Sequence, residues 1–471
     1  MATTADTPSQ LSTPAIELEP LPLHTAADEP TITAAESQED LMAANLPPVD
    51  GGKGAWLYLA GAIVTEINIF GSAYSQGTYL AYHTSNPSSP FHNSSASALS
   101  AIGSILVGGA FAAPYLFHGV LKANPHIILQ VYFATMVTTF LSLLAASFLP
   151  AGSAGPLIFL QGVIPGVAGG IAFLPAQMWL SEWFVQRRGS AAALLYLGSG
   201  IGGIMFPLVF DALLKRFAFR WTLRWQAGIQ TGLAGIALMI MRPRIPIRRP
   251  PPSSSADRRW KQYMPGSFAP LLCVPGVIGA VITVLQASAW TAISLYLSTL
   301  CISIGLSETA ANGLLAAYNG SAVVSFMFAA ILVDRLSTGV LMAISTTGCA
   351  LATFLLLGFA RSLDVVLPFI LMFGVLGASF STFVISMPRA VMLANSKATD
   401  FNQLSFIFIL IRGLGATAGP LVASVLYDAG KATKNDLWGS HGMKNLVIFS
   451  GTVMGSVAAI SISFRQQLKS V

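Results

Sequence analysis

Apolar stretches of about 20 residues or more recur from Gly54 to the C-terminus, separated by short polar segments. An α-helix needs about 20 mostly apolar residues to cross the roughly 30 Å hydrocarbon core of a bilayer. Twelve stretches meet this requirement, near 54–81, 97–121, 126–149, 155–181, 189–214, 221–241, 269–300, 309–333, 337–360, 363–388, 400–428 and 443–464. The pattern predicts an all-α membrane protein with twelve transmembrane helices.

The composition favours the same class. Hydrophobic residues make up 54% of the 471 residues, whereas charged residues make up 9%, against about 25% in soluble domains. The mean hydropathy is +0.67. So few charges cannot cover the surface of a soluble globule, so a soluble enzyme is excluded and the lipid bilayer is an expected partner.

Charge is unevenly distributed along the chain. Residues 1–50 contain nine acidic residues and no lysine or arginine, so we expect a disordered, acidic cytosolic tail. The basic residues after it gather mainly in alternate loops, and this bias places both termini in the cytosol. The basic pI of about 9.3 therefore reflects membrane topology, and no nucleic-acid partner is expected.

A basic loop divides the expected helices into two groups of six. Residues 242–268 combine seven basic residues with prolines and serines, which is typical of an extended cytosolic linker. We expect an N-terminal half at 51–241 and a C-terminal half at 269–471. Matching helix breakers support this division, since Pro207 and Pro420 are 213 residues apart, as are Pro175 and Pro388. The offset predicts two related six-helix repeats.

Two segments carry a family resemblance. Residues 50–56 read DGGKGAW, and residues 183–191 read WFVQRRGSA. Together they resemble the signatures of the monocarboxylate porter family within the major facilitator superfamily, in a form similar to fungal members. The resemblance implies two pseudo-symmetric six-helix halves and transport of a monocarboxylate-like solute by alternating access, as a proton symporter.

One position departs from this family. Its members commonly carry an arginine in helix eight, eight residues before an acidic or polar position, and here that place is taken by Phe326. The acidic partner one turn earlier falls on Ala322. This favours a larger or less charged solute, so export of a fungal secondary metabolite is an alternative function. A sensor built on a transporter scaffold is an alternative of another class.

Ionisable side chains at bilayer depth are costly and indicate function. Glu66 and Arg412 each lie about 18 Å into a predicted helix, at 1.5 Å per residue. We expect Glu66 to take a proton or Arg412 to bind an anionic group, with the other as counter-ion; a structural ion pair is the alternative. Further substrate candidates are Asn68, Tyr74, Gln177, Trp290 and Asn319.

Charges at two helix junctions are candidates for gating. They are Glu182, Arg187 and Arg188 after the fourth helix, and Asp334 and Arg335 after the eighth. We expect salt bridges that break during transport; topology alone is the alternative for the arginines.

Other motifs bear on cofactors and location. The sequon at Asn93 predicts glycosylation of the first outside loop. Neither paired histidines nor a phosphate-binding loop occur in the sequence, so we expect no metal, no cofactor and no enzyme activity. The resemblance implies the plasma membrane, with the vacuolar membrane as the alternative.

Overall fold

Helices dominate the part of the chain that the structure describes. The computed structural model describes residues 46–247, 266–332, 335–384, 387–395, 400–430 and 437–469. Most of the predicted tail, residues 248–265 of the predicted linker, and Asp334 lie outside these residues. Within the described ranges, eleven helical stretches are long and apolar enough to cross a membrane. One of them consists of two helices, so these ranges supply twelve crossings, and the predicted fold class is confirmed.

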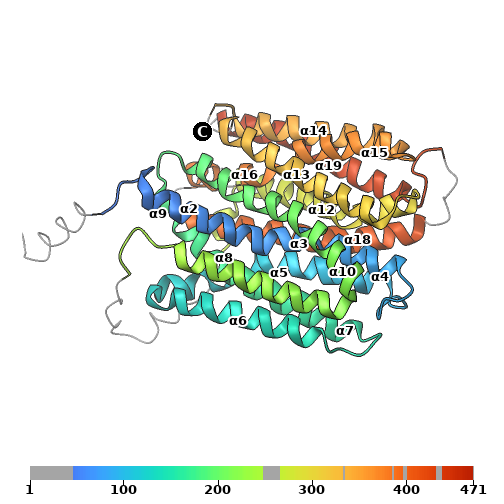
Figure 1. The fold of residues 1–471 in the computed structure, drawn as a ribbon. Coiled ribbons are helices and arrows are strands. Elements are labelled where there is room, and N and C mark those ends of the chain that lie inside the picture. The colour runs from blue at the N-terminus through green and yellow to red at the C-terminus, as the bar shows by residue number, and fades with distance from the viewer. Residues whose placement is uncertain are drawn as a thin grey trace, which may run out of the picture. The chain divides into compact units, whose positions relative to one another are not determined.

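The first six crossings begin at Gly52 and end at Ile240 (Figure 1). Their elements are α2 (Gly52–Glu66), the π-helix η1 (Ile67–Gly71), α3 (Ser72–Tyr74), α4 (Gln76–Ser85), α5 (Ala96–Ala123), η2 (Pro125–Ile127), α6 (Ile128–Ala146), α7 (Ala154–Leu157), the π-helix η3 (Ile158–Val163), α8 (Ile164–Met178), α9 (Leu180–Trp183) and α10 (Arg188–Ile240).

The last six crossings follow the predicted linker. Their elements are η4 (Ala269–Leu271), α12 (Val274–Ser303), α13 (Glu308–Leu332), α14 (Thr338–Leu355), η5 (Leu357–Phe359), α15 (Leu363–Ala378), α16 (Phe380–Val384), α17 (Met387–Ala394), α18 (Phe401–Gly430) and α19 (Lys444–Lys469).

The fifth and sixth crossings correct one prediction. The sequence predicted a loop between helices at 189–214 and 221–241, but the two helices that make up the 53 residues of α10 meet without an intervening loop. The chain reverses at Ala218, which alone within α10 leaves helical geometry, with φ 57° and ψ 179°. Residues 215–220 contain no glycine or proline, so nothing in this segment stops either helix before the turn itself.

Glycines on α10 let it pack closely against the first crossing. A Cβ atom added at Gly202 would lie 2.5 Å from the carbonyl oxygen of Ile67, and one added at Gly198 would lie 2.5 Å from that of Ile63. A Cβ atom does not fit at these distances, so only glycine can occupy either position. The small-residue surface therefore fixes the position of α2 and η1 against α10, as small residues do in membrane bundles.

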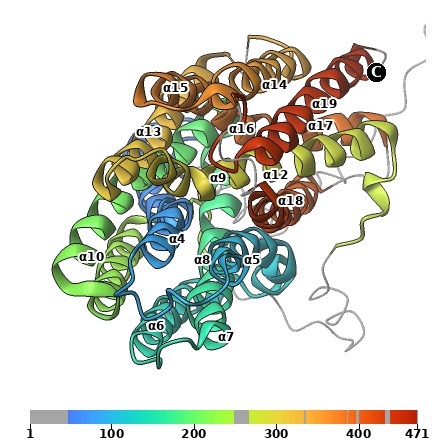
Figure 2. The ribbon, with the colours of Figure 1, turned by 90° about the vertical axis from the view of Figure 1, so that its right-hand side faces the viewer.

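Two long helix pairs join the first six crossings to the last six. Helix α5 packs along α18, and α10 packs along α13 (Figure 2). The first crossing also meets the seventh, because α4 packs on α12. A Cβ atom added at Gly77 would lie 3.0 Å from the carbonyl oxygen of Leu295, so the two groups are in close contact at this end.

Candidate substrate cavity

A cavity of about 1030 Å³ lies between the two groups of helices. Its wall includes Glu66, the last residue of α2, and Arg412, in the middle of α18. Glu66 is 2% exposed and Arg412 is 5% exposed. The two ionisable side chains that the sequence singled out therefore meet the same internal space, one from each group.

Arg412 is held by a neutral partner. Its Nη1 atom donates a hydrogen bond of 3.1 Å to Oε1 of Gln286 on α12. Its guanidinium carbon also lies 5.9 Å from the ring centre of Phe111, within the range of a cation–π contact. Among the described residues, no carboxylate oxygen lies within 4.0 Å of Arg412. The expected ion pair with Glu66 is thus absent from this conformation, and the guanidinium charge is not neutralised.

In contrast to Arg412, Glu66 has a side-chain oxygen that no described residue contacts by a hydrogen bond. Its Oε2 atom is buried and accepts no hydrogen bond from the described part of the chain. Tyr74 and Tyr196 each interact electrostatically with both Glu66 and Arg412. Tyr196 on α10 and Tyr74 on α3 both line the cavity, so their hydroxyl groups add to its polar surface.

The other predicted substrate residues divide between two places. Gln177 lines this cavity, and its Nε2 donates a hydrogen bond of 3.1 Å to the hydroxyl of Tyr196. Tyr74, Trp290 and Asn319 also line it. The side-chain amide of Asn319 donates a hydrogen bond of 3.2 Å to the carbonyl oxygen of Gly203, so it also joins α13 to α10.

Asn68 lies elsewhere, in a second cavity inside the first six crossings. Asn68 therefore does not line the cavity that Tyr74 lines. Two residues along an α-helix correspond to a rotation of about 200°. Asn68 therefore faces away from Glu66.

Aromatic rings form much of the remaining wall. Trp290 stacks on Tyr318 with ring centres 4.9 Å apart and on Phe373 at 5.7 Å, which holds the indole in place. The aromatic residues that line the cavity are Tyr74, Phe111, Phe173, Tyr196, Trp290, Phe326, Phe401 and Phe406. The space therefore suits a molecule with a large apolar surface.

Residues at one end of the helices mark the mouth of the cavity. Ser181 on α9 and Arg188 at the start of α10 line it from the first six crossings, and Phe401 and Asn402 at the start of α18 line it from the last six. The guanidinium carbon of Arg188 lies 5.1 Å from the ring centre of Phe401. Arg188 thus lies at the entrance, where its charge adds to that of Arg412.

The other gating candidates form no ion pairs with one another among the described residues. Glu182 instead accepts hydrogen bonds from the backbone amides of Arg244, at 3.2 Å, and Ile245, at 3.3 Å. Arg187 and Arg335 are exposed, and Asp334 lies outside the described residues. Among the residues that the structure describes, Glu182 therefore forms no salt bridge with Arg187 or Arg188, because it caps the segment that leaves α10.

One ion pair does join the two groups at the mouth end. Nζ of Lys122 on α5 lies 2.7 Å from Oδ2 of Asp400, next to α18. Partial burial acts to raise the pKa of Asp400, but the hydrogen bond from Lys122 and that from the backbone amide of Gln403 outweigh it, so the pKa lies below its ordinary value. The pair anchors α18 beside the entrance.

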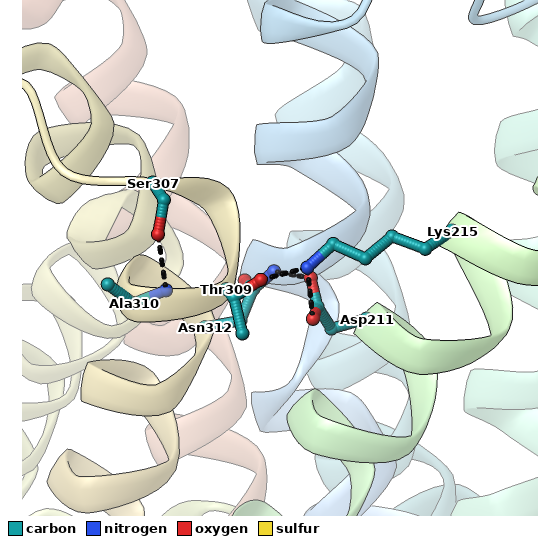
Figure 3. Close-up of polar contacts among 6 residues, drawn as sticks. All are labelled: Asp211, Lys215, Ser307, Thr309, Ala310 and Asn312. Atoms are coloured by element: carbon teal, nitrogen blue, oxygen red, sulfur yellow. Dashed lines mark hydrogen bonds and ion pairs between the residues drawn. The ribbon is translucent and has the colours of Figure 1, made fainter.

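A polar cluster closes the opposite end (Figure 3). Asp211 on α10 accepts a hydrogen bond of 3.0 Å from the side-chain amide of Asn312 on α13, and its second oxygen lies 2.7 Å from Nζ of Lys215. Lys215 also donates to the hydroxyl of Thr309 on α13. Next to it, the hydroxyl of Ser85 donates 2.7 Å to Glu308. We call Asp211, Lys215, Thr309 and Asn312 the α10–α13 latch.

Comparisons with known proteins agree with this architecture. A family model described as Major Facilitator Superfamily matches residues 59–420. The MFS transporter asaE of Aspergillus flavus is 25% identical over 427 residues, covering 89% of this chain and 88% of that protein. The Fujikurins efflux protein of Gibberella fujikuroi is 24% identical over 454 residues, covering 93% of this chain and 87% of that protein.

A solved structure supports the fold independently. The crystal structure of a D-xylose-proton symporter superposes with a TM-score of 0.62, covering 87% of this chain and 97% of that one. The sequence identity is 15%, so this likeness bears on the arrangement of helices alone.

Proposed function

The chain belongs to the major facilitator superfamily and is a secondary active transporter of small organic solutes, and from this premise we propose that it exports an acidic, largely apolar metabolite in exchange for protons. The observation that carries the proposal is Arg412, a buried guanidinium bound to the neutral Gln286 inside an aromatic cavity. An unneutralised cation in an apolar space favours an organic anion as its partner.

Glu66 is our candidate for the proton site. It is the one carboxylate among the residues that line the central cavity, and its Oε2 accepts no hydrogen bond from described residues. A carboxyl group in this setting is stabilised when it carries a proton or meets a cation. Tyr74 and Tyr196 line the same cavity and interact electrostatically with both Glu66 and Arg412, so they are our candidates to link the two events.

A place in the monocarboxylate porter-like family fits the same residues. Phe326 and Ala322, which occupy the positions of the family's helix-eight arginine and its acidic partner, both line the central cavity. We propose that recognition of the anion has moved from the eighth crossing to Arg412 on the eleventh. Because Phe326 replaces a charged residue, the wall is apolar at this position and can contact the apolar part of a larger solute.

Gating is assigned to the two ends of the helices. With the mouth open near Arg188 and the latch closed between α10 and α13, this conformation faces one side of the membrane. For the cavity to open to the other side of the membrane, the latch must break as the mouth closes. The two groups of six helices are proposed as the bodies that move against each other, joined by residues 242–268.

The test is flux in proteoliposomes that contain the purified full-length chain. We use a panel of aromatic and long-chain organic acids with their methyl esters as uncharged controls, and a pH gradient as the driving force. We expect acids to be transported and esters not. Glu66→Gln should abolish the response to the gradient, and Arg412→Met should lower acid flux by at least tenfold, whereas Arg216→Gln, which removes an exposed arginine on α10, should change neither.

Two outcomes would overturn parts of this proposal. Equal transport of acids and esters would remove the role of Arg412, and gradient-driven flux through Glu66→Gln would remove the proton role of Glu66. Complete lack of flux with every compound, together with correct folding, would favour the sensor alternative.

Direction and location require cells. Metabolite profiling of the host, with the gene deleted and overexpressed, should show a compound retained inside deleted cells and enriched in the medium on overexpression. Asn93 is exposed in the loop between α4 and α5. If glycosidase treatment shifts the electrophoretic mobility of the wild type but not that of Asn93→Gln, this loop lies outside the cytosol. The plasma membrane is the proposed site, and labelling confined to the vacuole would correct it.

A further inference from the structure

A second cavity, of about 660 Å³, lies inside the first six crossings. Every residue that lines it falls between Asn68 and Ala234, so it receives no contribution from the last six crossings. Movement of one group of helices against the other leaves such a space intact. It is therefore not part of an alternating pathway, and a different role is needed to explain it.

Carboxamides and hydroxyls supply its polar surface. The lining contains no aspartate, glutamate, lysine, arginine or histidine. Three of its carboxamide oxygens, Oδ1 of Asn68, Oε1 of Gln161 and Oε1 of Gln230, are buried and accept no hydrogen bond from the described residues. An unpaired buried acceptor costs about 1–3 kcal/mol. Three such groups on one cavity indicate that something else donates to them.

Local backbone geometry leads to the same place. The described residues contain two π-helices, η1 and η3, and each contributes one of these carboxamides: Asn68 from η1 and Gln161 from η3. Single π-helical turns inside α-helices are frequently found at functional sites. The third carboxamide, Gln230 on α10, is fixed by its Nε2, which donates 2.7 Å to the hydroxyl of Ser72.

We propose that this cavity is a second ligand site, separate from the transport cavity, for an uncharged amphiphilic molecule whose O–H or N–H groups donate to these carboxamides. Apolar side chains, among them Met136, Leu143 and Ala172, form the rest of the wall and receive the apolar part of the ligand. A charged ligand is disfavoured, because the lining offers no counter-ion.

Occupancy of this site would reach the transport cavity through η1. Asn68 and Ile69 on η1 line the second cavity, while Glu66, directly before η1, and Tyr74, the last residue of α3, line the first. Phe70 of η1 packs against Phe111 at 4.7 Å and against Phe173 at 5.2 Å between ring centres. A ligand that stabilises the wide turn of η1 would therefore set the position of Glu66; this consequence for transport rests on the proposed function, whereas binding itself does not.

The test measures ligand binding without substrate. The full-length protein, in nanodiscs of phosphatidylcholine, is heated with and without 1,2-octanediol, an uncharged amphiphile with two hydroxyl donors. The control is 1,2-dimethoxyoctane, which has a similar body and no donor. We expect the diol to raise the midpoint of thermal unfolding by about 1–2 °C at tenfold excess over its dissociation constant, and the methylated analogue to have no effect.

Variants locate the effect. Gln161→Leu and Gln230→Leu should each abolish the shift, whereas Gln177→Leu, the same change in the transport cavity, should keep it. The proposal is overturned by an equal shift with the methylated analogue, by a shift that survives both glutamine changes, or by stabilisation with sodium ions in place of the diol. Transport by Glu66→Gln bears on the proposed function alone, since no substrate enters this measurement.

Discussion

Asp50 holds the backbone amide of Arg187 with its carboxylate at 3.0 Å, across 137 residues of sequence. The same carboxylate accepts the amides of Val185, at 3.0 Å, and Gln186, at 3.1 Å. In return, the backbone amide of Asp50 donates a hydrogen bond of 2.8 Å to the carbonyl oxygen of Trp183. The segments 50–56 and 183–191 are therefore one structural unit that joins the start of α2 to the start of α10.

Replacement of Asp50 by asparagine should loosen this unit. The carboxamide keeps one acceptor oxygen and turns an –NH₂ donor toward backbone donors, so at least one hydrogen bond is lost. We expect Asp50→Asn to lower the free energy of unfolding by about 1 kcal/mol. Thermal unfolding in nanodiscs measures it, with Lys53→Gln as the control for a charge change in the same segment; an unchanged midpoint in Asp50→Asn would contradict the role.

The same carboxylate predicts a pH dependence. Partial burial acts to raise the pKa of Asp50, but the amides of residues 185–187 and the charge of Arg187 outweigh it, so the pKa lies below the ordinary value of 3.8. A lowered pKa gives stability that is fully present above the unfolded value and is lost as the pH falls through the folded value. The difference in midpoint between wild type and Asp50→Asn should therefore be constant above about pH 5 and shrink below about pH 4.

Ala218 should be improved by glycine. Its φ of 57° with ψ of 179° lies in a region that glycine adopts and other residues enter at a cost of about 1–3 kcal/mol. We expect Ala218→Gly to raise the unfolding midpoint, and Ala212→Gly, within the regular part of α10, to lower it because glycine costs about 1 kcal/mol in a helix interior. A lower midpoint in both would show that the turn does not strain Ala218.

The same turn shows where sequence reasoning fails. Hydrophobic length predicted the number of crossings and their approximate bounds, because the bilayer thickness sets them. It could not place the reversal at a single residue, since Lys215, Arg216 and Arg220 resemble a basic loop and are also good helix formers. Whether this segment forms a loop or stays helical is decided by the packing of α10 against α13 and α6.

The candidate site shows a similar division. Glu66 and Arg412 were found because charges within apolar helices are rare, and both line the central cavity. Gln286 was missed, since a carboxamide in an apolar run carries no signal until its partner is known. Asp211 and Asn312 are 101 residues apart, and only the packing of α10 on α13 brings them together.

Gln286 provides a test of the charge on Arg412. In Gln286→Glu, a carboxylate takes the place of the amide that accepts from Arg412, and a counter-ion within the cavity competes with an anionic solute. We expect the KM for an organic acid to rise about tenfold, equivalent to about 1.4 kcal/mol. Gln177→Glu adds the same charge beside Tyr196 and should have a smaller effect; equal effects would mean that the total charge of the cavity matters and the contact with Arg412 does not.

The α10–α13 latch predicts that transport stops when its two helices are tied together. In the double variant Asp211→Cys and Asn312→Cys, a short bis-methanethiosulfonate replaces the 3.0 Å hydrogen bond by a bridge of two disulfide bonds, with sulfinate as the leaving group at each cysteine. Because outward movement requires α10 and α13 to separate at this end, we expect flux to fall at least tenfold on cross-linking and to return on reduction. Each single variant treated in the same way should keep its flux, since the native cysteines Cys301 and Cys349 are buried and the half-buried Cys273 lies at the start of α12, outside the latch. Unchanged flux through a fully cross-linked protein would show that these helices stay together throughout the cycle, and closure would then have to be sought between α4 and α12.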